Sequence, residues 1–157
     1  GVQTCALPIS MLQKRDAIIA ENVALIRSIP EKYFTEVESM VFRSIAKGGD
    51  RKQLADEIER EFGKRHGITR RRAEFIARDQ VRKATSALAI ARMQGVGIEE
   101  AEWMHSGGAN KPRHSHVIAG KERRRFRLDK GCLIDGEYIY PGQLPGCGCT
   151  CKPVLPF

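Results

Sequence analysis

The chain has 157 residues, enough for one ordinary domain or for a compact domain preceded by a helical arm. Its 41% hydrophobic and 29% charged residues are typical of a folded globular protein and exclude a chain that is disordered throughout. With 27 Lys and Arg against 19 Asp and Glu, the net charge is +8, which fits either a polyanion as partner or a solvated basic surface.

The first ten residues do not share the pattern that follows them. A helical pattern starts only at Met11, and no basic region precedes a long apolar core as in a signal peptide. We interpret residues 1–10 as a non-native leader, similar to translated sequencing-adapter sequence, and assign Cys5 no role. No run approaches the roughly eighteen apolar residues of a spanning helix, so no membrane partner is expected.

Apolar residues between positions 11 and 48 recur at helical spacing and predict two helices. The first covers residues 11–27, and Pro30 prevents it from continuing. The second covers residues 34–45 and stops at Gly48-Gly49. We expect the two to form a helical arm over residues 11–48.

Two further helices are expected between residues 50 and 95. Asp50, followed by Gln53, predicts a capped third helix with a reciprocal side-chain partner, which ends before Gly63. Thr69 predicts the cap of the fourth and longest helix, which runs to Gly95. The stripe expected to be buried on this helix is Ala73, Ile76, Ala77, Gln80, Ala84, Leu88 and Ala91.

Beyond Gly97, glycine and proline recur every few residues, which indicates an irregular lobe with short strands. Strand candidates are Ala101–His105, Arg125–Leu128 and Glu137–Tyr140. The expected fold class is α+β, with a domain over residues 49–157 in which helices (50–95) precede a β-containing lobe (98–157).

This lobe has few large apolar residues, so burial alone predicts marginal stability unless the lobe packs on the helices or is cross-linked. The large apolar residues expected in its core are Trp103, Phe126, Leu128, Ile134, Tyr138 and Ile139.

Cysteine and histidine gather in the same lobe. Three of the five cysteines stand at alternate positions near the end of the chain, which is unlike a secreted disulfide framework and fits a reducing cytoplasm. Thiolate and imidazole are ligands that zinc prefers, and a shared ion would cross-link the lobe. We predict that His116, Cys147 and Cys149 lie close together, with His114, Cys132 or Cys151 completing a tetrahedral site.

The spacing of these cysteines leaves a second interpretation open. The pattern is C-x-C rather than the C-x-x-C of a zinc knuckle, and the histidines lack the usual H-x-x-x-H separation. The thiols then serve as small packed residues or a redox-sensitive pair, and the histidines form hydrogen bonds. Zinc is therefore a possible cofactor, and no cofactor is certain.

The segment from residue 111 to 130 has eight basic residues against two acidic ones, and we describe it as a basic loop. Such a density of arginine suits the phosphates of double-stranded DNA without reading its sequence. The alternative is the charged solvent face of an edge strand. The candidate residues are Lys111, Arg113, Lys121, Arg123, Arg124, Arg125, Arg127 and Lys130.

A second basic group, Arg70-Arg71-Arg72, begins the long helix, where positive charge opposes the helix dipole. Either an anionic partner offsets this cost, or the arginines belong to a solvated face with acidic residues nearby.

No enzyme is predicted, because no residues here fix a nucleophile, a base and an orienting group in a recognised order. The H-x-E signature of zinc deaminases is absent, since Ser115 is followed by His116. A metal-dependent nuclease that uses the histidines and cysteines remains the alternative.

Several motifs occur in a fixed order along residues 23–157. They are Leu25–Pro30, Thr69–Ala73, Ile76–Gln80, Gly97-Ile98, Trp103, Pro112-Arg113, Ser115-His116, Gly120, Pro141-Gly142 and a C-x-C pair before Pro153. This ordered set resembles the Mu F-like family of phage head-morphogenesis and minor head proteins. The residues that carry it most directly are Arg78, Asp79, Gln80, Trp103, Arg113, His116, Gly120, Cys147 and Cys149.

The resemblance implies a protein made in the host cytoplasm and incorporated in few copies into the procapsid, near the portal. Its implied partners are portal, scaffold or coat proteins, and packaged DNA in some members. Some members are fused to toxins in prophages, so a toxin-associated module is an alternative. The family's terminal motif usually reads asparagine, cysteine, arginine, cysteine, whereas here Gly146 precedes Cys147-Gly148-Cys149 and the arginine is missing.

Overall fold

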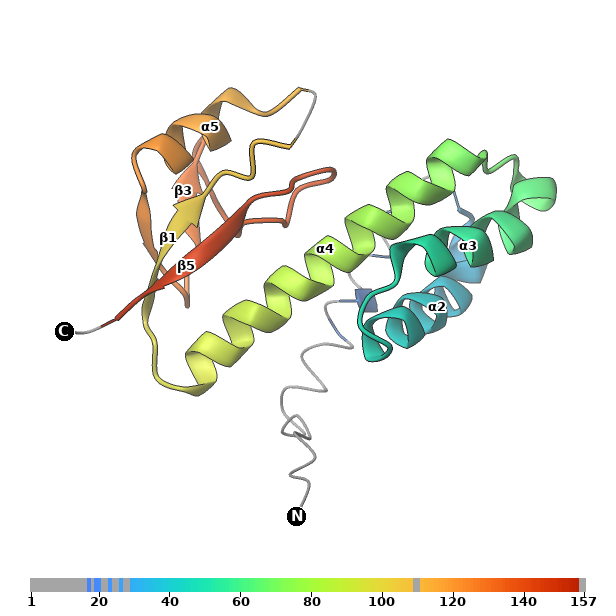
Figure 1. Ribbon diagram of the computed structural model, residues 1–157, viewed down its shortest axis with the longest axis horizontal. Coiled ribbons are helices and arrows are strands. Elements are labelled where there is room, and N and C mark those ends of the chain that lie inside the picture. Colours follow the sequence, from blue (N-terminus) through green and yellow to red (C-terminus); the bar gives the residue numbers. More distant parts are fainter. Residues whose placement is uncertain are drawn as a thin grey trace, which may run out of the picture. The chain divides into compact units, whose positions relative to one another are not determined.

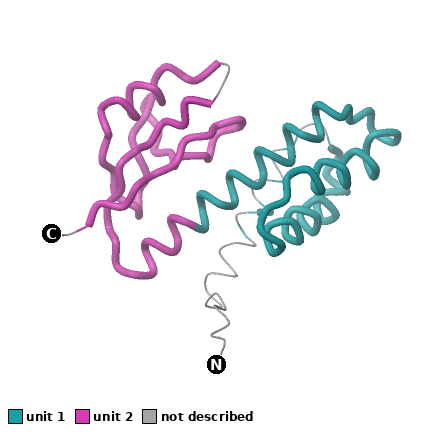
Figure 2. Tube along the Cα trace, in the orientation of Figure 1, with its two compact units in different colours: residues 1–88 teal, residues 89–157 magenta. Residues whose placement is uncertain are grey.

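The computed structural model describes residues 29–108 and 111–155, together with Ala17, Ile19, Ala20, Val23 and Ile26. The chain forms two compact units, residues 1–88 and 89–157 (Figure 2). The predicted leader and most of the predicted helix over residues 11–27 lie outside the described residues. Within the described part, no helix is both long and apolar enough to cross a membrane.

Unit 1 is helical. It contains the short 3-10 helix η1 (Glu31–Tyr33), α2 (Phe34–Ala46), α3 (Arg51–His66) and most of α4 (Arg70–Gly95) (Figure 1). Apolar residues three or four positions apart place one side of each helix in a shared core. This core includes Val37, Val41, Leu54, Ile58, Phe62, Ala73, Ile76 and Ala77, each at most 2% exposed.

The N-terminal cap of α3 agrees with the prediction in part. The Asp50 carboxylate accepts hydrogen bonds from the backbone N–H groups of Lys52 and Gln53, at 2.9 and 3.0 Å. The side chain of Gln53 does not return to Asp50, because its amide nitrogen donates to Glu57 at 3.4 Å. The predicted reciprocal partner was therefore wrong.

The C-terminal end of α3 was also predicted wrongly. The helix continues through Gly63 to His66. It ends at Gly67, whose φ of 65° places it in the left-handed region that glycine adopts without strain.

Helix α4 begins and ends as predicted. The Thr69 hydroxyl oxygen accepts a hydrogen bond from the Arg72 backbone N–H at 3.3 Å, and the helix ends at Gly95. All positions of the predicted stripe are buried. The helix also buries an ion pair between Lys83 and Asp79, with 2.9 Å between Nζ and the carboxylate.

The arginine at the start of α4 has anionic partners within the chain. Arg70 pairs with Asp56, with Glu59 at 3.0 Å and with Glu74 at 2.8 Å. These hydrogen bonds, chiefly the one that Arg70 donates to Asp56, raise the pKa of Arg70 above its usual value. Acidic residues of α3 and α4 thus offset its conflict with the helix dipole.

Unit 2 contains the end of α4, a small antiparallel sheet and one further helix. Strand β1 (Glu100–Met104) is central, between β2 (Arg125–Arg127) and β5 (Thr150–Val154). Helix α5 (His114–Lys121) contacts β1 (Figure 1). Ala119 of this helix joins Ala101 and Trp103 in the core. Alternation along β1 buries Ala101 and Trp103 completely.

The remaining strands, β3 (Cys132–Ile134) and β4 (Glu137–Ile139), form a hairpin. Its two turn residues, Asp135 and Gly136, both have positive φ, at 53° and 85°. Positive φ at both positions is typical of the type I′ turn that suits an Asp-Gly pair.

The α+β class and the three predicted strands are confirmed, whereas α5, β3 and β5 were not predicted. The prediction that Tyr138 belongs to the core of the lobe is wrong, because this residue is 60% exposed. Its cross-strand partner Leu133 is 50% exposed. The other five expected core residues are buried. The separation of residues 11–48 from 49–157 remains a prediction.

Candidate metal centre

The imidazole of His116 is held inside unit 2 by helix α5. His116 is the third residue of the helix and only 2% exposed. Just before the helix, the Arg113 guanidinium donates a hydrogen bond to the Pro145 carbonyl oxygen at 3.1 Å. This bond joins the start of α5 to the loop that leads into Cys147.

Cys147 and Cys149 lie in the loop before β5, and each is 5% exposed. The Cys147 backbone N–H donates to the Leu144 carbonyl at 2.9 Å, which closes a turn through Gly146 with a φ of 71°. Cys149 stands directly before β5, whose pairing with β1 sets Thr150 opposite Met104. The strand pairing therefore fixes Cys149 beside the end of β1.

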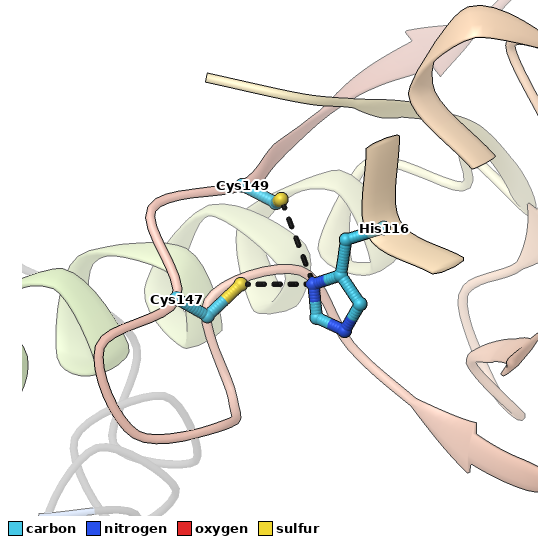
Figure 3. A group of neighbouring side chains, drawn as sticks. All are labelled: His116, Cys147 and Cys149. Carbon is cyan, nitrogen blue, oxygen red and sulfur yellow. Dashed lines mark hydrogen bonds between the residues drawn. The ribbon is translucent and has the colours of Figure 1, made fainter. Parts of the chain in front are cut away.

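These three side chains converge (Figure 3). The Nδ1 atom of His116 lies 3.4 Å from the Cys147 sulfur and 3.7 Å from the Cys149 sulfur. All three potential ligand atoms lie within 4.8 Å of one another. The predicted closeness of His116, Cys147 and Cys149 is thus what the structure shows.

Trp103 packs against this group from β1. Its ring meets the imidazole of His116 edge-on, with 5.1 Å between ring centroids and 81° between planes. The side-chain N–H of Trp103 is buried with no hydrogen-bond partner among the described residues. Beyond the strand, the backbone N–H of Ser106 favours the thiolate form of Cys149 and so acts to lower its pKa.

The two thiols are electrostatically coupled. The hydrogen bond from Cys149 lowers the pKa of Cys147 to about 5 against the opposing effect of burial, and backbone N–H groups of Cys149 and Gly142 add to the shift. The same contact with Cys147, together with burial, raises the pKa of Cys149. The two thiols therefore titrate as a pair, in which each sulfur shifts the pKa of the other.

The two nitrogens of His116 have different surroundings. Nδ1 faces the sulfurs, whereas Nε2 is buried with no hydrogen-bond partner among the described residues. In the tautomer that carries its proton on Nε2, Nδ1 has a lone pair directed at the thiol pair. That lone pair can accept a hydrogen bond from a thiol or bind a cation.

The three other predicted ligands do not join the group. His114 is exposed, because residues two apart on a helix point in nearly opposite directions. Cys132 is buried on β3, where burial raises its pKa. Cys151 lies in β5, two positions beyond Cys149, which corresponds to about 6.6 Å along an extended strand. Burial raises the pKa of Cys151 to about 11.

Gly120 allows α5 to lie close to the end of β1. A Cβ atom at this position would overlap the side chain of His105 and stand 2.9 Å from its backbone nitrogen. Six of the motif residues therefore serve one region of unit 2. They are Trp103, Arg113, His116, Gly120, Cys147 and Cys149.

The remaining motif residues, Arg78, Asp79 and Gln80, lie on α4 in unit 1. Asp79 and Gln80 are buried, with Asp79 in the ion pair with Lys83, whereas Arg78 is exposed over the ring of Phe75.

The description of residues 111–130 as a loop is wrong, because the segment contains α5 and β2. Strand β2 is at one edge of the sheet, and Arg125 and Arg127 are exposed on either side of buried Phe126. This arrangement matches the charged edge strand that was one of the two interpretations.

Several of the candidate DNA-binding arginines pair with acidic residues of the chain. Arg124 pairs with Glu122 at 2.7 Å, Arg125 with Glu102 at 3.5 Å and Arg127 with Asp129 at 2.9 Å. In the described part of the chain, five of the candidates have no carboxylate within ion-pair distance. These are Lys111, Arg113, Lys121, Arg123 and Lys130.

Sequence reasoning did not identify the groups that position the cluster. The backbone N–H groups of Ser106 and Gly142 and the carbonyl of Pro145 carry no side-chain signal. The Pro141-Gly142 and Pro145-Gly146 pairs indicate turns, and this is the sequence signal that could have located these backbone groups.

The profile of the family described as "Phage Mu protein F like protein" matches residues 35–152, most of the chain. The chain belongs to this family. Membership in the Mu F-like family relates the chain to the phage head.

A relative of this Mu F-like chain from Haemophilus influenzae (strain ATCC 51907 / DSM 11121 / KW20 / Rd), named "Uncharacterized protein", is 34% identical over 146 residues. The match covers 93% of this chain and 30% of the relative, so the chain spans about a third of that protein's length. No solved structure gives a significant match to the chain.

Proposed function

We propose that this protein is a phage minor head protein that acts in head assembly. In this proposal it is made in the host cytoplasm and enters the procapsid, where it contacts portal, scaffold or coat protein and packaged double-stranded DNA. The observation that carries the proposal is the family match over residues 35–152. The six motif residues gathered in unit 2 support it, because they build a structural element rather than an open cleft.

The burial of the cluster favours assembly over catalysis. A hydrolytic metal keeps one ligand position open to substrate and water. His116, Cys147 and Cys149 are 2%, 5% and 5% exposed, so a nucleic-acid phosphate has no access to them in this conformation. A metal-dependent nuclease or a toxin-associated module that uses this cluster would have to open unit 2 first.

Particle composition tests the proposal. The gene product, carrying an affinity tag, is produced during phage growth, and procapsids and mature heads are separated from free protein by gradient sedimentation. We expect the tagged protein to co-sediment with procapsids in low copy number relative to coat protein, as quantified by mass spectrometry. Chemical cross-linking in the same fractions should join it to portal, scaffold or coat protein.

Two outcomes would overturn this proposal. The first is tagged protein found only in the free fractions while coat protein assembles normally. The second is DNA or RNA cleavage that depends on zinc, magnesium or manganese and is abolished by His116→Ala, which would favour the nuclease instead.

A further inference from the structure

We infer that His116, Cys147 and Cys149 bind one zinc ion through Nδ1 and the two sulfurs, and that this ion cross-links unit 2. The inference does not depend on the proposed role in head assembly, since it concerns what holds this unit together. It rests on the geometry, the charge and the location of the cluster.

The distances suit a shared ion. Zinc binds thiolate sulfur at about 2.3 Å and imidazole nitrogen at about 2.0–2.1 Å, and tetrahedral angles then place nitrogen and sulfur about 3.6 Å apart. The observed separations of 3.4 and 3.7 Å from Nδ1 lie on either side of that value. Both nitrogen–sulfur separations therefore fit a shared ion.

The charges also suit zinc. Two thiolates and a neutral imidazole carry a charge of −2, so a divalent cation would make the buried group neutral. Thiolate and imidazole together favour zinc over magnesium or calcium, which prefer oxygen ligands.

The location indicates what the ion does. His116 is on α5, whereas both cysteines lie in the loop that leads into β5, so an ion between them joins two segments more than thirty residues apart. Unit 2 is small and built from short strands, and such units often depend on a metal or disulfide for stability. The burial of the ligands keeps a substrate away from the ion, which suits a cross-linking role.

The described residues supply three ligands, and a tetrahedral zinc has four. No fourth histidine, cysteine, aspartate or glutamate belongs to the group within the described part of the chain. We assign the fourth position to a nitrogen or oxygen ligand, either water or a side chain. The resulting coordination sphere has two sulfurs and two lighter atoms.

Metal content and spectroscopy of the full chain test this inference. We expect about one zinc per chain after purification without chelators, measured by inductively coupled plasma mass spectrometry. X-ray absorption at the zinc edge should show two sulfurs at about 2.3 Å and two nitrogen or oxygen atoms at about 2.0–2.1 Å. This measurement needs no variant, so it stands even if substitutions prevent folding.

Variants identify the ligands. Cobalt added to the metal-free chain should give a sulfur-to-metal charge-transfer band, and Cys149→Ser or His116→Asn should weaken cobalt binding at least tenfold. Cys132→Ser is the matched control, because this thiol is equally buried but outside the group, and its cobalt spectrum should not change. Removal of zinc with a strong chelator should lower the unfolding temperature of wild type more than that of Cys149→Ser.

Three results would overturn the inference. One is purified wild-type chain with no zinc that also fails to bind added zinc or cobalt. Another is a coordination sphere without sulfur, or with four sulfurs. The third is a thiol titration of the purified, unfolded chain that finds Cys147 and Cys149 joined as a disulfide, since oxidised sulfurs cannot bind zinc.

Discussion

Gly120 shows how one residue can determine a close contact in unit 2. It lies in helix α5, where an alanine would normally add about 1 kcal/mol of helix stability. A methyl group at this position would overlap the side chain of His105. The steric cost and the gain in helix propensity therefore oppose each other.

We expect Gly120→Ala to lower the free energy of unfolding by about 1–3 kcal/mol, because overlap in a packed region outweighs helix propensity. Denaturant unfolding followed by circular dichroism measures this change. Gly108→Ala is the control, since a Cβ atom there meets nothing within 4 Å and should shift stability by no more than about 0.5 kcal/mol. Equal effects of the two substitutions would show that the contact with His105 is unimportant.

At the scale of elements, the cap of α3 depends on a single side chain. Asp50 satisfies two backbone N–H groups at the start of the helix, whereas Gln53 binds Glu57 one turn further on. The sequence pattern predicts that Asp50 and Gln53 each bind the other's backbone with their side chain. In the structure only the side chain of Asp50 does so. The two residues should consequently differ in their contribution to stability.

Asp50→Ala should destabilise unit 1 by about 0.5–2 kcal/mol, as the loss of an N-terminal cap usually does. Gln53→Ala removes only an exposed hydrogen bond, so we expect a change within about 0.5 kcal/mol. Thermal unfolding of the two variants provides the comparison. If Gln53→Ala cost as much as Asp50→Ala, a reciprocal cap in solution would be indicated.

At the scale of the whole molecule, the net charge of +8 bears on the proposed contact with DNA. Not all of the basic residues are equally free to bind phosphate, because Arg124, Arg125 and Arg127 pair with carboxylates of the chain. Lys121, Arg123 and Lys130 have no such partner in the described part of the chain. If DNA is bound here, this second set should bind the phosphates.

Replacing Lys121, Arg123 and Lys130 by glutamine should weaken binding to all DNA sequences alike. The slope of log K against log salt should flatten by up to ~0.9 for each phosphate that the variant no longer neutralises. The matched control replaces Arg124, Arg125 and Arg127, removes the same charge, and should change the slope less. Fluorescence anisotropy at several salt concentrations measures both, and an unchanged slope in the first variant would exclude DNA binding through this surface.

Local chemistry explains which elements could be predicted from the sequence. Helices α2, α3 and α4 have apolar residues at helical spacing, with Pro30, Asp50 and Thr69 marking boundaries. By contrast, α5 is only eight residues long and has no continuous apolar stripe, so its pattern did not distinguish it from a loop. The Asp135-Gly136 turn was a usable hairpin signal that was not recognised.

The sequence by itself determined helices α2, α3 and α4, the family and the three residues at the centre of the candidate metal site, because periodicity, motif order and ligand chemistry are properties of residue types. Only the tertiary structure decided that Nδ1 of His116 faces both sulfurs and that His114, Cys132 and Cys151 stay outside the group. Distances between residues far apart in the chain depend on how β5 pairs with β1 and how α5 packs on β1. Those interactions are long-range, and no local pattern encodes them.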